Sequence, residues 1–521
     1  MYSQTGLIPV FIQFQEYLLQ DLTQLFEAII MKITRILSIT IILVALMGCE
    51  DFLSVNPQSE LTQEAFPTTQ EDALQTTNAV YATLRDWHYH SGGFPILDFM
   101  SDDAHKGSNP NDGVNTQGPY ERFTHSTTQD GLDRWWNALY QGIRRANIVL
   151  ERVSPIEMDA QLKNRYLGEA SFLRALYYFD LVRAFGGVPL VTDVEPDLEV
   201  PRSSAGDIYE LIESDLLFAV DNLPLKSEYG SNDLGRATKG AAQALLAKVY
   251  LFKQDFVNAE EYAMEVILSG EYDLEEAFVD ANGPEGEHGA ESVFEIGAVT
   301  TAGAGGNQYA NTQGVRGTPN RGWGFNRPTI NLREAFGEDD PRRPGTIIEL
   351  GDVIDGIEII GDSTTPDETT DEEGNVIEIE SYNRKVWIPG MSTDTQFGHN
   401  RRLIRYSDVL LMAAEALNEN DKPGEALTYL NSVRERARHG DETILPDITE
   451  TDKDLLRDRI IEERRLELAL EGHRFWDLVR TGKADEVLSP AGFITGKHEL
   501  LPIPQSEIDL SQGSLTQNEN W

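Results

Sequence analysis

The stretch RATKGAAQALLAKVYLFKQDFVNAEEYAMEVILSG, residues 236–270, decides the fold class of this chain. Its small and apolar residues recur at helical spacing across two segments that are separated near Asp255. Four of them fall at tetratricopeptide-like positions: Leu246, Ala247, Tyr250 and Ala259. Small residues allow paired helices to approach closely, so the stretch predicts a packed helix pair.

A second copy of this pattern is expected in residues 405–438. Ala414 and Ala426 repeat the offset of Ala247 and Ala259, and Leu430 continues the apolar face. Repeats of this kind bury their faces only against neighbours, so at least about three pairs must stack. The earlier helices that would complete the stack are predicted at residues 69–87, 131–153, 158–185 and 207–223.

Two irregular stretches interrupt the helical pattern. Residues 88–129 and 271–399 are rich in glycine, asparagine and short β-like runs such as 292–296 and 382–388. The acidic run 362–374 lacks EF-hand spacing and is expected to be a solvated loop. Long irregular stretches on a helical scaffold are where binding surfaces tend to be built.

The N-terminal part reads as an export signal. The apolar run 36–47 follows Lys32 and Arg35, and it is too short to span a bilayer. Cys49, the only cysteine, follows directly after Gly48 and resembles a lipid attachment site. We therefore expect a lipoprotein signal peptide at 31–48, with an ordinary membrane helix as the alternative.

Residues 1–30 contain no Lys or Arg and cannot be the cationic head of that signal. We interpret them as a misassigned upstream extension, or alternatively as a short amphipathic helix. The formal charge of the whole chain is −44. This negative charge repels phosphate groups, which argues against nucleic-acid binding and against electrostatic binding to anionic lipids. Membrane anchoring is then left to acyl chains on Cys49.

Several sequence blocks together resemble the SusD and RagB family of outer-membrane nutrient-binding lipoproteins. They are GEASFLRALYYFDLVRAFGGVPLV (168–191), GRATKGAAQALLAKVYL (235–251), RYSDVLLMAAEALN (405–418), IIEERRLELALEGHRFWDLVRTGK (460–483) and LLPIPQSEI (500–508). Met47 departs from the commonest lipobox residue, and residues 1–30 have no counterpart.

The resemblance implies a mostly α, SusD-like fold, in which tetratricopeptide-like helix pairs carry an irregular, loop-rich ligand-facing subdomain. The expected regions are 49–270 with the ligand-facing loop 88–129, the irregular insertion 271–399, and 400–521. It also implies a lipid-anchored protein that faces the cell exterior. The implied partners are an oligosaccharide ligand and a SusC-like TonB-dependent transporter.

The densest charge cluster is read as structural rather than catalytic. It contains Glu462, Glu463, Arg464, Arg465, Glu467, Glu471, Arg474 and Asp477. Glu463 and Glu467 lie one helical turn apart, as an acid and base pair could. However, Glu462 with Arg465, Arg464 with Glu467, and Glu471 with Arg474 are each three residues apart, which predicts ion pairs on one helix.

The sequence contains no recognisable nucleophile, nucleotide or zinc motif, and its nine histidines have no ligand spacing. His88 and His90 are read as polar loop residues rather than metal ligands. We therefore expect no cofactor, no metal and no enzymatic activity.

Binding is better supported than catalysis. A receptor for sugars needs exposed aromatic rings beside polar groups. The first candidate set is Arg85, Trp87, Tyr89, Asp102, Asp103 and Tyr120; the second is Asn307, Tyr309, Arg321, Trp323, Phe325 and Asn326. We expect the glycines beside Trp323 to expose its ring and let the backbone approach ligand. The alternative for each ring is that it packs in the core. We favour that alternative for Trp135 and Trp136, because they lie in a predicted helix.

The leading hypothesis is a non-enzymatic receptor for an oligosaccharide. Capture of peptide or glycopeptide is the alternative within the same class. A lipid-anchored glycosidase with carboxylates in 271–399, and a scaffold or adhesin that binds only protein, are the alternatives from other classes.

Overall fold

The computed structural model describes residues 22–38, 66–90, 98–196, 199–300, 307–371, 373–390 and 398–521. The chain divides into two compact units, Met1–Phe66 and Pro67–Trp521. In the first unit, residues 22–38 form an exposed helix that runs across the expected signal start at Met31. Cys49 and residues 39–48 of the expected signal lie outside the described residues. Within the described part of the chain, no helix has the length and apolar content to cross a membrane.

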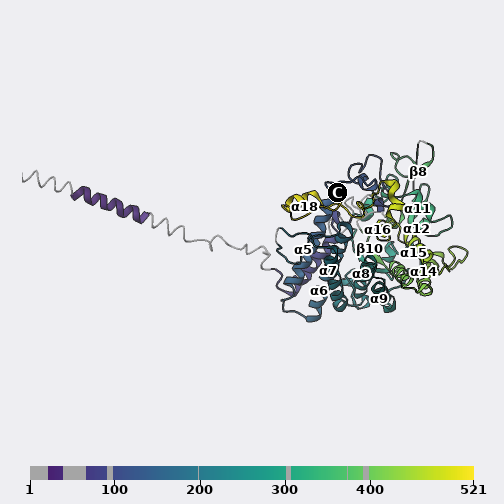
Figure 1. The fold of residues 1–521 in the computed structure, drawn as a ribbon, viewed down its shortest axis with the longest axis horizontal. Helices are drawn as coiled ribbons and strands as arrows, with labels where there is room; N and C mark the ends of the chain where they lie inside the picture. Colours follow the sequence, from purple (N-terminus) through teal and green to yellow (C-terminus); the bar gives the residue numbers. More distant parts are fainter. Residues whose placement is uncertain are drawn as a thin grey trace, which may run out of the picture. The chain divides into compact units, whose positions relative to one another are not determined.

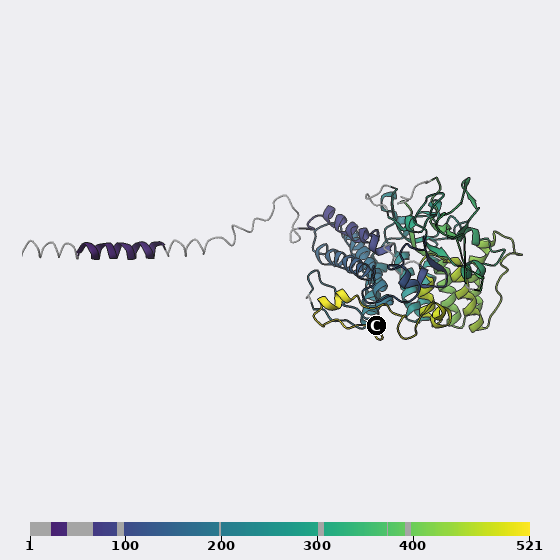
Figure 2. The same cartoon turned by 90° about the horizontal axis from the view of Figure 1, so that it is seen from above.

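The second unit is rich in helices, as the sequence predicts (Figures 1 and 2). Its first long helices are α2(Gln70–Leu84), α5(Leu132–Arg152), α6(Ala160–Phe185) and α7(Ala205–Asn222). Helix α6 packs against α5 on one side and α7 on the other. Both predicted core tryptophans of α5, Trp135 and Trp136, are buried.

Local sequence explains where these helices begin and end. Thr69 and Ser204 form capping boxes at the starts of α2 and α7, where their hydroxyls accept hydrogen bonds from backbone N–H groups. Gly186 ends α6 with a positive φ of 71°. The predicted helix ranges 69–87, 131–153, 158–185 and 207–223 agree with the structure to within a few residues.

The two predicted repeats are confirmed as helix pairs. They are α8(Lys239–Phe252) with α9(Phe256–Ser269), and α13(Tyr406–Glu419) with α14(Pro423–Arg438). Helix α13 also packs against α9, so the pairs stack on each other. The four alanines that define the repeat offset are fully buried: Ala247, Ala259, Ala414 and Ala426.

The C-terminal region adds α15(Lys453–Glu467), α16(Arg474–Arg480), α17(Ala484–Leu488) and α18(Gln505–Leu510). The short helices elsewhere are α3(Trp87–His90), α4(Gly118–Glu121), α10(Tyr309–Gln313), α11(Ile330–Ala335) and α12(Arg343–Thr346). The 3₁₀ turns are η1(Asp98–Met100), η2(Lys226–Glu228), η3(Ser231–Asp233), η4(Pro284–Gly286), η5(Arg384–Val386) and η6(Ser489–Ala491).

The described strands form five antiparallel two-stranded sheets. They pair β1(Ala104–Gly107) with β3(Phe325–Pro328), β2(Ser292–Ile296) with β10(Arg401–Arg405), β4(Ile347–Glu349) with β9(Ser381–Asn383), β5(Val353–Ile354) with β6(Ile357–Glu358), and β7(Glu368–Thr370) with β8(Val376–Ile379). The β1–β3 ladder joins the two irregular stretches, because His105 pairs with Arg327.

Two β predictions need correction. The run 382–388 is strand only at its start, because the Asn383 side chain accepts a hydrogen bond from the Lys385 N–H at 2.9 Å and begins the turn η5. The acidic run 362–374 is not wholly a loop, because Glu368–Thr370 pairs as β7 with β8. The prediction for 292–296 is confirmed as β2.

Buried ion pairs join the irregular insertion to the helical scaffold. Arg405, at the end of β10, donates from Nε to Glu471 Oε2 at 2.8 Å and from Nη1 to Glu467 Oε1 at 3.0 Å. It also pairs with Glu291, and Arg436 completes the cluster by donating to both Glu291 and Glu467. Burial alone raises the pKa of Glu467, but the surrounding arginines outweigh it and lower that pKa to about 2.

We expect Arg405→Met to destabilise the protein strongly. Removing one partner leaves carboxylates buried without full compensation, which costs about 3–5 kcal/mol of the free energy of unfolding. Arg457→Met is the matched control, because the Arg457 side chain is 35% exposed where it pairs with Glu419 and Asp454. That control should lose at most about 1 kcal/mol. Urea unfolding followed by circular dichroism measures both, and equal losses would contradict the expectation.

A second prediction concerns acid. His125 is buried, its ring stacks on Tyr120 with centroids 4.9 Å apart, and neither ring nitrogen has a hydrogen-bond partner among the described residues. Burial, with help from His498 and Lys497, lowers the pKa of His125 to about 3. The unfolded chain therefore binds more protons below pH ~6.5, and stability falls as the pH drops from there toward about 3.

His125→Phe should reduce this pH dependence without loss of stability at neutral pH, while His399, His473 and His498, whose pKa values burial also lowers, keep part of it. The phenyl ring keeps the stacking and removes two polar atoms that are buried without hydrogen bonds. Thermal unfolding of both proteins between pH 7 and pH 4 provides the measurement. A slope against pH that does not change in the variant would show that other groups cause the acid sensitivity.

Candidate functional site

Trp87 and Trp323 meet at the surface although they are far apart in the sequence. Trp87 begins α3, and Trp323 lies in the connection between α10 and β3. Their ring centroids are 5.6 Å apart with an interplanar angle of 67°, an edge-to-face contact. Both rings are half-buried. The two tryptophans, which we call the tryptophan platform, therefore combine a fixed arrangement with accessible ring surface.

The backbone around Trp323 explains why its ring is held in place. The Trp323 N–H donates to the Asn311 carbonyl at 2.8 Å, and the Gly324 N–H donates to the Gly314 carbonyl at 3.0 Å. A Cβ on Gly322 would lie 2.4 Å from the Asn311 oxygen, so only glycine fits there. Gly324 has a φ of +72°.

This corrects the expected reason for the two glycines. They permit the close approach of Trp323 to the backbone of α10 and Gly314, and no contact with a ligand is needed to explain them. The close contact still affects the Trp323 ring, because a rigid backbone fixes the direction in which the ring points.

Two other candidates remain accessible. Arg85 is exposed at the end of α2, and Phe325 is half-buried in β3, opposite Gly107. Arg85 lies two residues before Trp87, and Phe325 two residues after Trp323. The structure thus leaves Arg85, Trp87, Trp323 and Phe325 as the accessible members of the two predicted sets.

The three tyrosines of the sets are core residues, which is the alternative that the sequence left open. Tyr89 is 1% exposed and donates its hydroxyl to Asp180 at 3.0 Å. Tyr120 is buried and donates to the Asp130 carbonyl at 3.2 Å. Tyr309 is buried beneath the Arg401 guanidinium, which lies 5.0 Å from its ring centroid. Each ring is covered by protein, so we no longer place Tyr89, Tyr120 or Tyr309 on the binding surface.

The two aspartates of the first set are committed to ion pairs. Asp102 accepts two hydrogen bonds from Arg474, at 2.8 and 3.0 Å, and Asp103 accepts one from Arg465 at 2.8 Å. The Asp103 side chain is fully buried. These carboxylates attach the loop before β1 to the C-terminal helices, so they are structural rather than available to sugar hydroxyls.

The remaining polar candidates are buried as well. Asn326 accepts a hydrogen bond from the Asp98 N–H at 2.8 Å and donates to Gln313 at 2.9 Å. Asn307 donates to the His399 carbonyl at 3.1 Å. Arg321 is 1% exposed and lies 4.2 Å from the centroid of the Trp387 ring. Their contacts hold the insertion together beneath the tryptophan platform.

The charge cluster of residues 462–477 is a structural ion-pair network, as predicted, but most partners differ from those expected. Only Glu462 and Arg465 approach each other among the three expected pairs, at 3.9 Å, within the described residues. Arg464 instead binds Asp408 at 2.8 Å. A spacing of three residues does not predict these partners, because it identifies only neighbours on one exposed helix. In a buried cluster, charges instead pair with charges from distant segments.

A cleft of about 330 Å³ lies beside Arg85 and was not foreseen from the sequence. It is lined by Asn78, Tyr81, Leu84, Arg85, Asn232, Leu234, Gly235, Arg236, Glu295, Ile296 and Gly297. These residues come from α2, the loop before α8 and the end of β2. No local sequence signal connects such distant segments.

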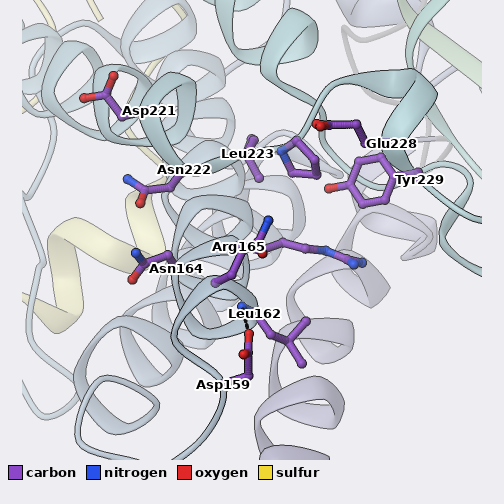
Figure 3. A pocket seen from close by; sticks show the side chains of 11 residues that line it. Asp159, Leu162, Asn164, Arg165, Asp221, Asn222, Leu223, Glu228 and Tyr229 are labelled. Carbon is purple, nitrogen blue, oxygen red and sulfur yellow. Dashed lines mark hydrogen bonds between the residues drawn. The ribbon is translucent and has the colours of Figure 1, made fainter.

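A second hollow of about 510 Å³ lies between the start of α6, the end of α7 and the loop that follows (Figure 3). Polar side chains, among them Asn164, Asn222 and Glu228, surround it in Figure 3. The ring of Tyr229 has the Arg165 guanidinium 4.6 Å from its centroid, and its hydroxyl donates to Ala237. This hollow therefore offers no second platform of open aromatic rings.

The described residues contain no group of three or more His, Cys, Asp or Glu side chains that could hold a metal ion. His88 lies in α3, next to Trp87. The expectation for Cys49 stays a prediction, because that residue lies outside the described part of the chain.

Comparisons with known proteins agree with this architecture. The model of the SusD family matches residues 290–521, and a family model described as "Starch-binding associating with outer membrane" matches residues 51–251. SusD-like protein P38 of Formosa agariphila is 31% identical over 512 residues, which cover 91% of this chain and 97% of that protein.

Solved structures show the same similarity. A laminarin binding SusD-like protein is 30% identical, with a TM-score of 0.74 over 87% of this chain and 100% of its own. Surface glycan-binding protein A from Bacteroides thetaiotaomicron, solved in complex with laminarihexaose, is 27% identical, with a TM-score of 0.71 over 87% of this chain and 100% of its own. The helical scaffold, its tetratricopeptide-like pairs and both halves of the sequence therefore agree, and this chain belongs to the SusD family.

Proposed function

We propose that this protein is a non-catalytic receptor that binds an oligosaccharide on the tryptophan platform. The observation that carries the proposal is the contact between Trp87 and Trp323, which presents two fixed, half-buried rings at one place on the surface. Sugar rings have apolar C–H faces that pack on aromatic rings, and their hydroxyl rims bind nearby polar groups. Arg85 is exposed and lies two residues before Trp87, so we expect its side chain to contact the hydroxyl groups of a sugar bound there.

Laminarin oligosaccharides are the first ligand class to test. Two proteins of this fold, at 30% and 27% identity, are named for laminarin or were solved with laminarihexaose. These oligosaccharides carry no charge, so the strongly negative field of this chain, with a formal charge of −44, does not oppose their approach.

The electrostatics of the carboxylates support binding rather than bond cleavage. A glycosidase needs two carboxyl groups at one cavity, one of them with a raised pKa. Arginines lower the pKa of Glu467 to about 2, which suits an ion pair and not a general acid. Burial raises the pKa of Glu380, but that side chain is 1% exposed and out of reach of substrate. Glu287 is the other described carboxyl group of the insertion with a raised pKa, but it accepts a hydrogen bond from the Asn400 N–H at 3.1 Å. The nearby Glu295 is bound by His288 and Arg402, so both carboxyl groups are held by protein groups.

The proposed receptor is anchored by lipid at Cys49, faces the cell exterior, and passes its ligand to a SusC-like TonB-dependent transporter. The family model that covers residues 51–251 is described by association with the outer membrane, which supports this location. The sequence before Cys49 supports the lipid, because its apolar run is too short to span a bilayer.

Trp323→Ala and Trp87→Ala should each weaken binding of laminarihexaose by about tenfold or more, with unchanged helix content. Each change removes one ring of the platform and leaves the scaffold in place, and a tenfold loss corresponds to about 1.4 kcal/mol. Tyr429→Ala is the control, because Tyr429 is a half-buried aromatic residue on α14. Isothermal titration calorimetry measures the affinities.

Parent-like affinity in both tryptophan variants would remove the platform from the site. Competition by a peptide pool but not by a glycan pool would favour the peptide receptor instead. Release of shortened sugars from laminarin by the purified protein would establish the glycosidase.

Cys49→Ser should abolish acylation and release the protein from the membrane fraction. The thiol is the only one in the chain, so no second cysteine can take its place. Labelling with a radioactive fatty acid, followed by fractionation, provides the measurement, and Ser54→Ala serves as the control. Membrane retention of an unlabelled Cys49→Ser protein would contradict the lipid anchor.

A further inference from the structure

The cleft beside Arg85 has the size and chemistry of a ligand site. Its volume of about 330 Å³ lies within the usual range for ligand sites in proteins. Leu234, which is 47% exposed, contributes apolar surface at its edge, while Leu84 and Ile296 line the cleft but are only 1% and 4% exposed. Asn78 and Asn232, both exposed, place amide groups along it. Apolar surface beside amides is the combination that sugar rings require.

The polar groups that line the cleft are held in place, and the positive charge of Arg236 among them is neutralised by carboxylates. Arg236 donates to Asn78 Oδ1 at 2.7 Å, to Glu169 at 2.8 Å and to Asp233 at 2.8 Å. The Arg236 guanidinium is therefore committed to protein groups. It holds the Asn78 amide in a fixed orientation, so a neutral ligand suits this frame better than an anion does.

The cleft lies close to the tryptophan platform along the chain. Arg85 lines the cleft, and Trp87 follows it by two residues, a span of at most about 7 Å along the chain. An oligosaccharide that stacks on Trp87 thus has its next sugar units within reach of the cleft.

We propose that this cleft is a second subsite, which binds the sugar units of the same oligosaccharide that extend beyond the platform. The proposal rests on the function proposed above and adds where a longer chain is held. It implies that affinity rises with the length of the oligosaccharide, because a short oligosaccharide reaches only the platform and not the cleft.

Gly297→Phe tests the second subsite by filling it. Gly297 lines the cleft, no described atom lies within 4 Å of the position that its Cβ would take, and its φ lies outside the left-handed region, so we expect a side chain there to fit and to occupy the cleft. Gly424→Phe is the matched control, because Gly424 is equally open but lies at the start of α14.

We expect the parent protein to bind laminarihexaose about tenfold or more tightly than laminaritriose. Gly297→Phe should reduce the affinity for laminarihexaose to that for laminaritriose and leave the affinity for laminaritriose unchanged. Gly424→Phe should keep the difference. Calorimetry measures all affinities, and circular dichroism checks folding. If Gly297→Phe does not fold, Asn232→Ala replaces it in the test. This change at an exposed residue should reduce the same difference in affinity.

A chain-length difference that persists in Gly297→Phe, or in Asn232→Ala where that variant stands in, would overturn the second subsite, as would equal affinities of the parent for both oligosaccharides. In those cases the platform and the proposed function would stand. Absence of binding to either oligosaccharide by the parent protein would overturn both proposals together.

Discussion

The ion-pair cluster around Arg405 is the constraint on which the rest of the structure depends. Its carboxylates come from separate segments: Glu291 from the insertion, and Glu467 and Glu471 from the end of α15 and the turn after it. A buried charge is tolerated only when all its partners are present, so these segments must assemble together or leave uncompensated charge inside the protein. The insertion that carries Trp323 is attached to the helical scaffold in this way.

The helices could be predicted because their signals are local. Caps such as Thr69 and Ser204, and the repeated alanines of the paired helices, act within a few residues of where they stand. The partners in the charge cluster could not be predicted from spacing, because Arg464 reaches Asp408 on another helix instead of its neighbour Glu467. The strand expected at 382–388 ends at Asn383 for a related reason. Lys385 turns inward to bind Glu471 at 2.6 Å, and a strand could not continue through that turn.

The candidate site was predicted in part. The sequence located the two irregular stretches and named Trp87 and Trp323, which the structure brings together. It could not separate these rings from Tyr89 or Tyr309, because irregular segments have no periodicity that distinguishes an inward from an outward side chain. The cleft beside Arg85 was missed entirely, since its lining residues are near one another only in the folded chain.

The arrangement of the platform favours binding because its ordering cost is met during folding. Ordering side chains at a binding surface costs about 0.5–1.5 kcal/mol for each one that becomes immobile. Here the hydrogen bond from the Trp323 N–H to Asn311 and the glycines on either side hold one ring, and the edge-to-face contact restrains the other. An oligosaccharide that binds at the proposed platform would meet a surface that is already in place. In the proposed receptor the helical scaffold therefore supplies the order that two isolated aromatic side chains cannot supply for themselves.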